Sequence, residues 1–317
     1  MHIVIIGNGI SGATAARFIR KYSDNQITMI SSESPYFFSR TAMMYVYMGH
    51  TRWKDIEPYE PWFWKKNRID LIFDKVNKVD TANKILHLDK AIQPIIYDKL
   101  IIATGSKTNK YGWPGQELNG VSGLYHKQDL EYITNLSTKI KKAVIIGGGL
   151  IGIELAEMLL SRNIEVTMLV REKSYWSNIL PSEESQMINN HIIEHKVDLR
   201  LNTTLSEIKG NASDNVEGVL LSDGSFIPCQ FVGITTGVTP NIDLVQSSEI
   251  EFDKGILVDE YLQTNLKDVF AIGDCAQIRK PHEGRQSIEP VWYTGRIMGE
   301  LVANNICNRP VIYDPGI

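Results

Sequence analysis

The chain opens with a short apolar run, HIVII at 2–6, which is typical of a strand buried on both faces. A glycine-rich turn follows, and from 13 to 22 (ATAARFIRKY) small and apolar residues recur at helical period, with basic residues at the end. A second apolar run, QITMI at 26–30, comes after the turn Asp24-Asn25. The pattern therefore predicts a β–turn–α–β unit at the start of the chain.

The same pattern returns near the middle of the chain. KKAVII at 141–146 predicts a strand, IELAEMLLSRN at 153–163 a helix, and EVTMLV at 165–170 the returning strand. Each unit is followed by apolar and polar residues alternating around turn signals, which predicts an antiparallel meander ending in a buried strand; these regions are 76–105 and 199–237. The fold class is therefore α/β, with two Rossmann-like domains that each combine a parallel sheet with a meander.

Both units carry glycines at G-x-G-x-x-G spacing between the strand and the helix; these are Gly7, Gly9 and Gly12, then Gly147, Gly149 and Gly152. In such a loop the first glycine permits the tight turn, the second lets a pyrophosphate approach, and the third lets helix and strand pack closely. The anion then lies at the positive end of the helix. Two intact loops in this context predict two dinucleotide sites, the alternative being a duplicated scaffold with one inactive site.

Composition excludes several classes of protein. The 317 residues are 43% hydrophobic and carry a net charge of −4, without the basic stripe of a nucleic-acid binder. The three cysteines, Cys229, Cys275 and Cys307, lie too far apart for an iron–sulfur or zinc cluster, so we expect no metal and a reducing compartment. No apolar stretch has the length of a membrane span, and the chain begins directly with a strand rather than a signal peptide. We therefore expect a soluble, cytoplasmic protein.

Five segments in order carry a family resemblance: GNGISG (7–12), LIIATGS (100–106), GGGLIGIE (147–154), TTGVTPN (235–241) and TNLKDVFAIGDCA (264–276). With them the chain resembles a flavoprotein of the pyridine nucleotide–disulfide oxidoreductase superfamily. The resemblance assigns FAD to the first unit and NADH or NADPH to the second. It implies an FAD-binding domain in two segments, 1–112 and 243–317, with the NAD(P)H-binding domain, 113–242, between them.

The resemblance also implies which residues bind the cofactors. Asp274 would hydrogen-bond a ribityl hydroxyl, and the helix EPVWYTGRIMGELVANNI would direct its N-terminus at the flavin pyrimidine, where its dipole favours negative charge on the reduced ring. The expected cofactor-binding residues are Gly7, Gly9, Ile10, Ser11, Gly12, Ser32, Glu33, Arg40, Ala103, Thr104, Gly105, Gly147, Gly149, Leu150, Ile151, Gly152, Arg171, Gly237, Gly273, Asp274, Val291 and Trp292.

The stretch PYFFSRTAMMY at 35–45 indicates the branch of the superfamily. Disulfide reductases place a cysteine pair here and the peroxidase-like relatives one cysteine, but this chain has no cysteine before Cys229. A thiol–disulfide relay needs a thiolate beside the flavin, so that chemistry is excluded. The stretch instead resembles the NADH–rubredoxin, ferredoxin and nitrite reductase flavoproteins, in which a basic residue near the flavin pairs with a glutamate of the second loop. The matching residues, expected to be catalytic, are Arg40 and Glu154.

The chain departs from the family pattern in three places. The NAD unit ends its second strand with Val170 rather than a glutamate, and Arg171 follows as in NADPH-type sites, although Glu172 beside it keeps NADH open. In the FAD unit Ser31 stands at the strand end, and Glu33 is the nearest carboxylate. The chain also ends where relatives continue into a C-terminal interface domain, so it is either a fragment or does without that domain, and a homodimer stays open.

The expected function is transfer of hydride from NAD(P)H to FAD and of electrons onward to an acceptor: a small redox protein, a quinone-like compound or a nitrite-reductase-type partner. The alternative is an apoptosis-inducing-factor-like flavoprotein that signals by changing conformation, and a siderophore or dye reductase is a third hypothesis. Trp53, Trp62 and Trp64 are either core residues or part of an acceptor site.

Overall fold

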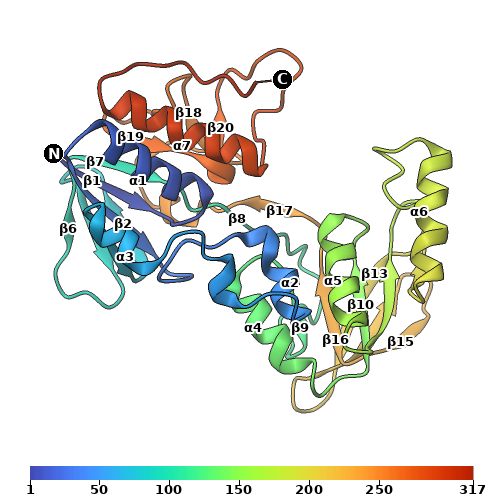
Figure 1. Ribbon diagram of the computed structural model, residues 1–317. Coiled ribbons are helices and arrows are strands. Elements are labelled where there is room, and N and C mark those ends of the chain that lie inside the picture. The colour runs from blue at the N-terminus through green and yellow to red at the C-terminus, as the bar shows by residue number, and fades with distance from the viewer. Residues whose placement is uncertain (317) are drawn as a thin grey trace. The chain divides into compact units, whose positions relative to one another are not determined.

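The computed structural model describes residues 1–316 and divides into two compact units (Figure 1). Unit 1 comprises Met1–Ser39, Lys54–Lys107 and Thr239–Ile317, and unit 2 comprises Arg40–Trp53 and Thr108–Val238. These divisions lie within a few residues of the expected boundaries at 112 and 242. They differ in one respect, because Arg40–Trp53 belongs to unit 2 rather than to the first segment of the FAD domain.

Unit 1 is built on a five-stranded parallel sheet in the order β19-β7-β1-β2-β3. Its strands are β1 (His2–Ile6), β2 (Gln26–Ser31), β3 (Ile69–Phe73), β7 (Lys99–Ile102) and β19 (Val269–Ala271). The central strand is apolar at every position from Ile3 to Ile5, and all three side chains are fully buried. That is the pattern of a strand covered on both faces.

Two helices of unit 1 pack closely on each other, α1 (Ile10–Tyr22) and α7 (Trp292–Ile306), as Figure 1 shows. A Cβ on Gly299 would lie 2.5 Å from the carbonyl oxygen of Ser11, so this approach requires glycine. The expected helix from Glu289 in fact begins at Trp292, because Pro290 and an extended Val291 precede it. The third helix, α3 (Pro61–Lys66), packs on β3.

Smaller elements complete unit 1. The predicted antiparallel meander is confirmed as β4 (Val76–Asp80), β5 (Ile85–Leu88) and β6 (Ile95–Ile96). A parallel pair consists of β18 (Ile256–Val258) and β20 (Ala276–Ile278). Short 3₁₀ helices are η2 (Trp53–Ile56), η3 (Asp243–Val245) and η4 (Gly273–Cys275).

Unit 2 repeats the architecture with a parallel sheet in the order β12-β11-β10-β16-β9. Its strands are β9 (Val121–Ser122), β10 (Lys142–Ile146), β11 (Glu165–Leu169), β12 (Asp198–Arg200) and β16 (Phe231–Ile234). Its helices are α4 (Lys127–Leu136), α5 (Leu150–Leu160) and α6 (Ser182–Glu194). The second predicted meander is also confirmed, as β13 (Leu205–Gly210), β14 (Val216–Leu221) and β15 (Phe226–Pro228). The connecting strands β8 (Ser106–Thr108) and β17 (Val238–Pro240) pair with each other.

The segment Arg40–Trp53 joins unit 2 through η1 (Arg40–Ala42) and α2 (Met43–Tyr47), the latter packing on α4 and α5. The Arg162 guanidinium carbon lies 3.9 Å from the centre of the Tyr47 ring, and Arg162 donates to the Tyr47 carbonyl at 2.9 Å. The Tyr47 hydroxyl is also hydrogen-bonded to that of Ser137. These contacts connect residues about a hundred positions apart, which explains why the local sequence did not predict them.

Within residues 1–316, none of the helices combines the length and apolarity that a membrane crossing requires.

Candidate functional site

The expected FAD residues follow neighbouring strands of the unit 1 sheet. The first glycine loop comes after β1, the Ala103-Thr104-Gly105 turn after β7, and Gly273-Asp274 after β19. Because these strands are parallel, all three segments lie at the same edge of the sheet. In the strand order, β2 lies on one side of β1 and β7 on the other. In α/β sheets, ligands bind beside such a switch in strand order, at the carboxyl ends of the strands.

The first loop leaves space beside its middle glycine. Gly7 has φ +110°, and a Cβ there would lie 2.1 Å from the Ala103 carbonyl oxygen, so the turn itself needs glycine. A Cβ on Gly12 would lie 2.0 Å from the Gly7 carbonyl oxygen. Beside Gly9, by contrast, a Cβ would meet no described atom within 4 Å. The outer glycines therefore serve the protein's own packing, whereas the middle one leaves room that a ligand can fill.

The second loop has the same geometry. Gly147 has φ +122°, and a Cβ there would lie 2.6 Å from the Thr235 carbonyl oxygen. A Cβ on Gly152 would lie 2.6 Å from the Gly147 carbonyl oxygen, and one on Gly149 would meet no described atom within 4 Å. The two loops therefore have the same geometry, each with tight packing at its outer glycines and space beside the middle one.

The helices that begin at these loops present free N–H groups. Gly9 is the N-cap of α1 and Gly149 the N-cap of α5, and neither helix has a side-chain cap or an acidic residue in its first turn. The first N–H groups of a helix have no partner within it and attract anions. Both loops therefore fit the phosphates of a dinucleotide.

Two residues that the sequence reasoning missed hold these loops in place. The buried Asn8 amide donates to the Ser34 carbonyl at 2.8 Å, which ties the first loop to the segment after β2. The Thr235 hydroxyl donates to the Ile146 carbonyl at 3.0 Å, directly before the second loop. Asn8 lies within the segment GNGISG and Thr235 within TTGVTPN. Their place in these segments was the only feature of the sequence that could have indicated their role.

The remaining expected FAD residues lie around the same edge of unit 1. Asp274 accepts a hydrogen bond from the Ser106 hydroxyl at 3.2 Å. Glu33 follows β2, and its N–H donates to the Ser31 hydroxyl at 3.2 Å. At the start of α7 the apolar side chains of Val291 and Trp292 are 47% and 42% exposed, which suits contact with a flat cofactor. Ile10, Ser11 and Ser32 lie on the first turn of α1 and after β2.

In unit 2 the expected nicotinamide dinucleotide residues surround the second loop. Val170 is buried and offers no carboxylate. The Arg171 side chain is 80% exposed and forms an ion pair with Glu172 at 2.9 Å. Arg171 is thus available to a 2′-phosphate, while Glu172 stays beside it. Leu150 and Ile151 begin α5, with Leu150 exposed, and Gly237 lies beyond β16 with φ +96°.

The two expected catalytic residues both lie in unit 2. The Arg40 guanidinium carbon is 4.5 Å from the centre of the Tyr125 ring, and Arg40 donates to the Tyr125 carbonyl. Glu154 is half-buried on α5, and its burial, together with the nearby Glu157, raises the pKa of its carboxyl group. Burial and the charge of Glu154 raise the pKa of Tyr175 to about 12. The pairing of Arg40 with Glu154 stays a prediction.

The three tryptophans have different surroundings. Trp64 is 1% exposed and belongs to the core of unit 1, whereas Trp62 is 56% exposed. The Lys127 ammonium lies 4.7 Å from the centre of the Trp53 ring. The core interpretation therefore holds for Trp64 and is wrong for Trp62.

The thiols of the described residues are all free, and the one beside the FAD edge is buried. Cys275 follows Asp274, and its S–H group lies 3.5 Å from the Ile102 carbonyl and 3.3 Å from that of Ile272. Burial raises the pKa of Cys275, and it raises the pKa of Cys229 to about 12. Neither group is poised as a thiolate, as a disulfide relay would require.

Comparison with known proteins agrees with this geometry. The family model described as pyridine nucleotide-disulphide oxidoreductase matches residues 1–296. A nitrite reductase [NAD(P)H] of Bacillus subtilis is 33% identical over 87% of this chain and 34% of its own length. A rubredoxin-NAD(+) reductase of Ectopseudomonas oleovorans is 26% identical over 97% of this chain and 80% of its own length. A ferredoxin reductase structure from Rhodopseudomonas palustris superposes with a TM-score of 0.91 at 24% identity, covering 99% of this chain and 78% of that one.

The chain therefore belongs to the pyridine nucleotide-disulphide oxidoreductase family. It is an oxidoreductase of that family, with FAD and NAD(P)H as its cofactors.

Proposed function

We propose that this chain takes hydride from NAD(P)H onto FAD and passes the electrons to a small redox protein. The observation that carries the proposal is the space beside the middle glycine in both loops, Gly9 and Gly149. The space beside Gly9 would take the pyrophosphate of the flavin, and the space beside Gly149 that of its reductant. FAD supplies the hydride-accepting ring, and the protein binds and orients both dinucleotides.

Unit 1 would bind FAD by its sheet edge. The N–H groups at the start of α1 would receive the pyrophosphate, and Asp274 a ribityl hydroxyl. The N-terminus of α7, at Val291 and Trp292, would favour negative charge on the reduced ring. In unit 2 the N–H groups at the start of α5 would bind the NAD(P)H pyrophosphate, with Arg171 beside the adenosine ribose. Arg40 and Glu154 would act at the reacting end.

The acceptor is proposed on chemical grounds. Since Cys229 and Cys275 are buried with raised pKa values, electrons on the flavin would leave directly to an external acceptor. The rubredoxin-NAD(+) reductase and nitrite reductase relatives support a protein acceptor. Neither supports the alternative of a conformational signalling protein. We place the activity in the cytoplasm, because free thiols fit a reducing compartment.

Anaerobic stopped-flow measurements test the proposal. NADH or NADPH should bleach the flavin absorbance, and adding rubredoxin or ferredoxin should restore it within the turnover time of a typical enzyme. Asp274→Asn should weaken FAD retention and leave binding of the nicotinamide dinucleotide unchanged. A long-lived reduced complex that neither redox protein reoxidises would contradict the proposal and favour a signalling role.

A further inference from the structure

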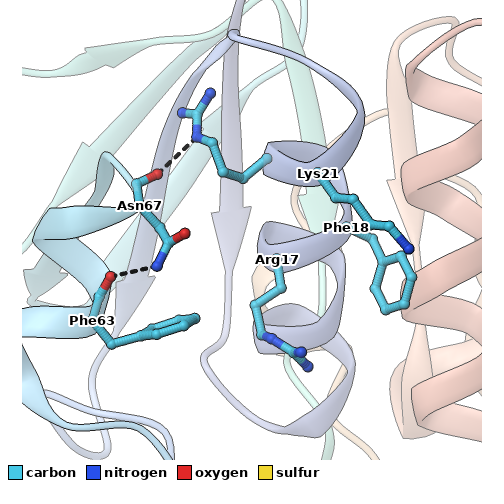
Figure 2. Close-up of a pocket in the computed structure, with 6 residues that line it drawn as sticks. Arg17, Phe18, Lys21, Phe63 and Asn67 are labelled. Carbon is cyan, nitrogen blue, oxygen red and sulfur yellow. Dashed lines mark hydrogen bonds between the residues drawn. The ribbon is translucent and has the colours of Figure 1, made fainter.

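Polar side chains on helices hold neighbouring turns in both units, and the two turns differ in what they carry. In unit 1 such contacts line an open pocket beside α1 and α3 (Figure 2). Arg20 donates to the Asn67 carbonyl at 2.7 Å, and the Asn67 amide donates to the Phe63 carbonyl at 2.8 Å. The turn after α3 carries no expected cofactor residue, so we assign these hydrogen bonds to the stability of the fold.

The turn 171–175 in unit 2 follows β11 and carries the residues that we place beside the adenosine ribose. Main-chain hydrogen bonds from the end of β12 hold its beginning. The Val170 N–H donates to the Arg200 carbonyl at 2.8 Å, and the Asn202 N–H donates to the Glu172 carbonyl at 3.0 Å. The turn is therefore fixed on the side of the sheet.

The end of the same turn is held by one buried side chain of α6. The Asn189 amide oxygen accepts from the Tyr175 N–H at 3.0 Å, and the Asn189 amide nitrogen donates to the Ser174 hydroxyl at 2.7 Å. Asn189 is 1% exposed and Tyr175 is 4% exposed, so water does not compete with the bond between them. Arg171 and Glu172 thus lie in a turn that is fixed at both ends.

The helix itself does not explain an asparagine at position 189. The residue lies on the buried side of α6 with Ile192, and asparagine is a weaker helix former than leucine or alanine. A buried amide also costs free energy unless it is hydrogen-bonded. Asn189 supplies what an apolar residue could not, namely an acceptor and a donor for the turn.

The direction of the Arg171 side chain depends on this main chain. The side chain is 80% exposed, and its ion-pair partner at 2.9 Å, Glu172, belongs to the same turn. The pair as a whole therefore takes its direction from the turn. An arginine recognises a phosphate through hydrogen bonds of defined geometry, so a displaced turn would weaken that contact.

We propose that Asn189 is a positioning residue for the choice of coenzyme, because it holds the turn that directs Arg171 at the 2′-phosphate of NADPH. This inference rests on the proposed function, which places Arg171 beside the adenosine ribose. Asn189 acts through the turn, since its amide is already engaged by Ser174 and Tyr175.

Calorimetric titration of the flavin-containing protein with NADP⁺ and with NAD⁺ tests the inference. Asn189→Ala leaves the buried Tyr175 N–H without its acceptor, so the turn should shift. The affinity for NADP⁺ relative to NAD⁺ should fall about fivefold, with the NAD⁺ affinity unchanged.

Ser185→Ala is the matched control. Ser185 lies one helical turn earlier in α6 and is fully buried, and its hydroxyl has no hydrogen-bond partner among residues 1–316. This variant changes the same side of the helix without touching the turn, so it should leave the affinity ratio at the wild-type value.

Two further variants distinguish positioning from a general loss of stability. Ser174→Ala removes one of the two hydrogen bonds and should lower the ratio about twofold, and it carries the test if Asn189→Ala does not fold. N189A/R171E should lose no more NADP⁺ preference than Arg171→Glu alone, because both changes act through one contact.

An unchanged ratio in Asn189→Ala, or an equal loss in Ser185→Ala, would overturn the inference. Additive losses in N189A/R171E would do the same. The redox function is tested separately, by reduction of the flavin in the wild-type protein. Its failure there would contradict the proposed hydride transfer, while the binding ratio would still decide the role of Asn189.

Discussion

The half-buried carboxyl group of Glu154 should lower the stability of the protein at high pH. Burial and Glu157 raise the pKa of its carboxyl group above the usual 4.5, so the folded state disfavours the charged form. Stability is then lost as the pH rises from about 4.5 through the folded-state pKa, and the loss stays constant above it. A residue held in this way is typical of a functional site.

Glu154→Gln removes this ionisation and should therefore stabilise the protein at high pH. We expect equal melting temperatures for variant and wild type at pH 4, and a rise of about 1–3 °C in the variant at pH 8. Glu157→Gln should give a smaller change of the same sign. A variant less stable than wild type at pH 8 would show instead that a cation, with Arg40 the first candidate, stabilises the Glu154 carboxylate.

Arg171 should determine the choice of nicotinamide dinucleotide. Because its guanidinium is exposed beside the second loop, Arg171→Glu should lower kcat/KM for NADPH relative to NADH by about tenfold or more. Lys173→Glu, the same charge reversal two residues on, is the control and should leave the ratio unchanged. If both variants give the wild-type ratio, Arg171 does not contact the 2′-phosphate.

At the scale of elements, a substitution in one glycine loop should weaken the binding of one cofactor and leave the other unchanged. A Cβ on Gly9 or Gly149 meets no described atom within 4 Å, so alanine at either position should fold, with a loss of no more than a few °C. Gly9→Ala should weaken FAD binding at least about tenfold and leave the NAD(P)H affinity unchanged, and Gly149→Ala should do the reverse. We expect Gly7→Ala to lose the fold of unit 1, because its Cβ would lie 2.1 Å from the Ala103 carbonyl oxygen.

Flavin content after dialysis and dinucleotide titration check these expectations. Gly9→Ala protein that keeps FAD as tightly as wild type would remove the basis for placing the flavin pyrophosphate at the first loop.

The two β–turn–α–β units and the two meanders were predictable because each is set by local hydrophobic period, whereas α4 (Lys127–Leu136) and α6 (Ser182–Glu194) were not predicted. The start of α7 was placed three residues early, since Pro290 and the extended Val291 are compatible with the apolar pattern but not with continued helix. Assignment of Arg40–Trp53 to unit 2 was not predictable. It depends on Arg162 packing against Tyr47, and contacts between such distant positions leave no local pattern.

For the whole molecule, the position of the thiols decides which chemistry is available. Cys229 and Cys275 are buried, and none of the thiols among residues 1–316 is in a disulfide. The flavin ring would then be the protein's single redox store. Replacing all three cysteines by serine should leave NAD(P)H-dependent dye reduction largely intact, apart from some loss of stability.

Anaerobic reductive titration tests this central claim most directly. The flavin released on denaturation should be FAD rather than FMN, because the first loop is shaped for a pyrophosphate. The native protein, and the cysteine-free variant equally, should take up about two electrons per FAD. Uptake of about four electrons, as in an enzyme with an additional redox-active disulfide, would contradict the account.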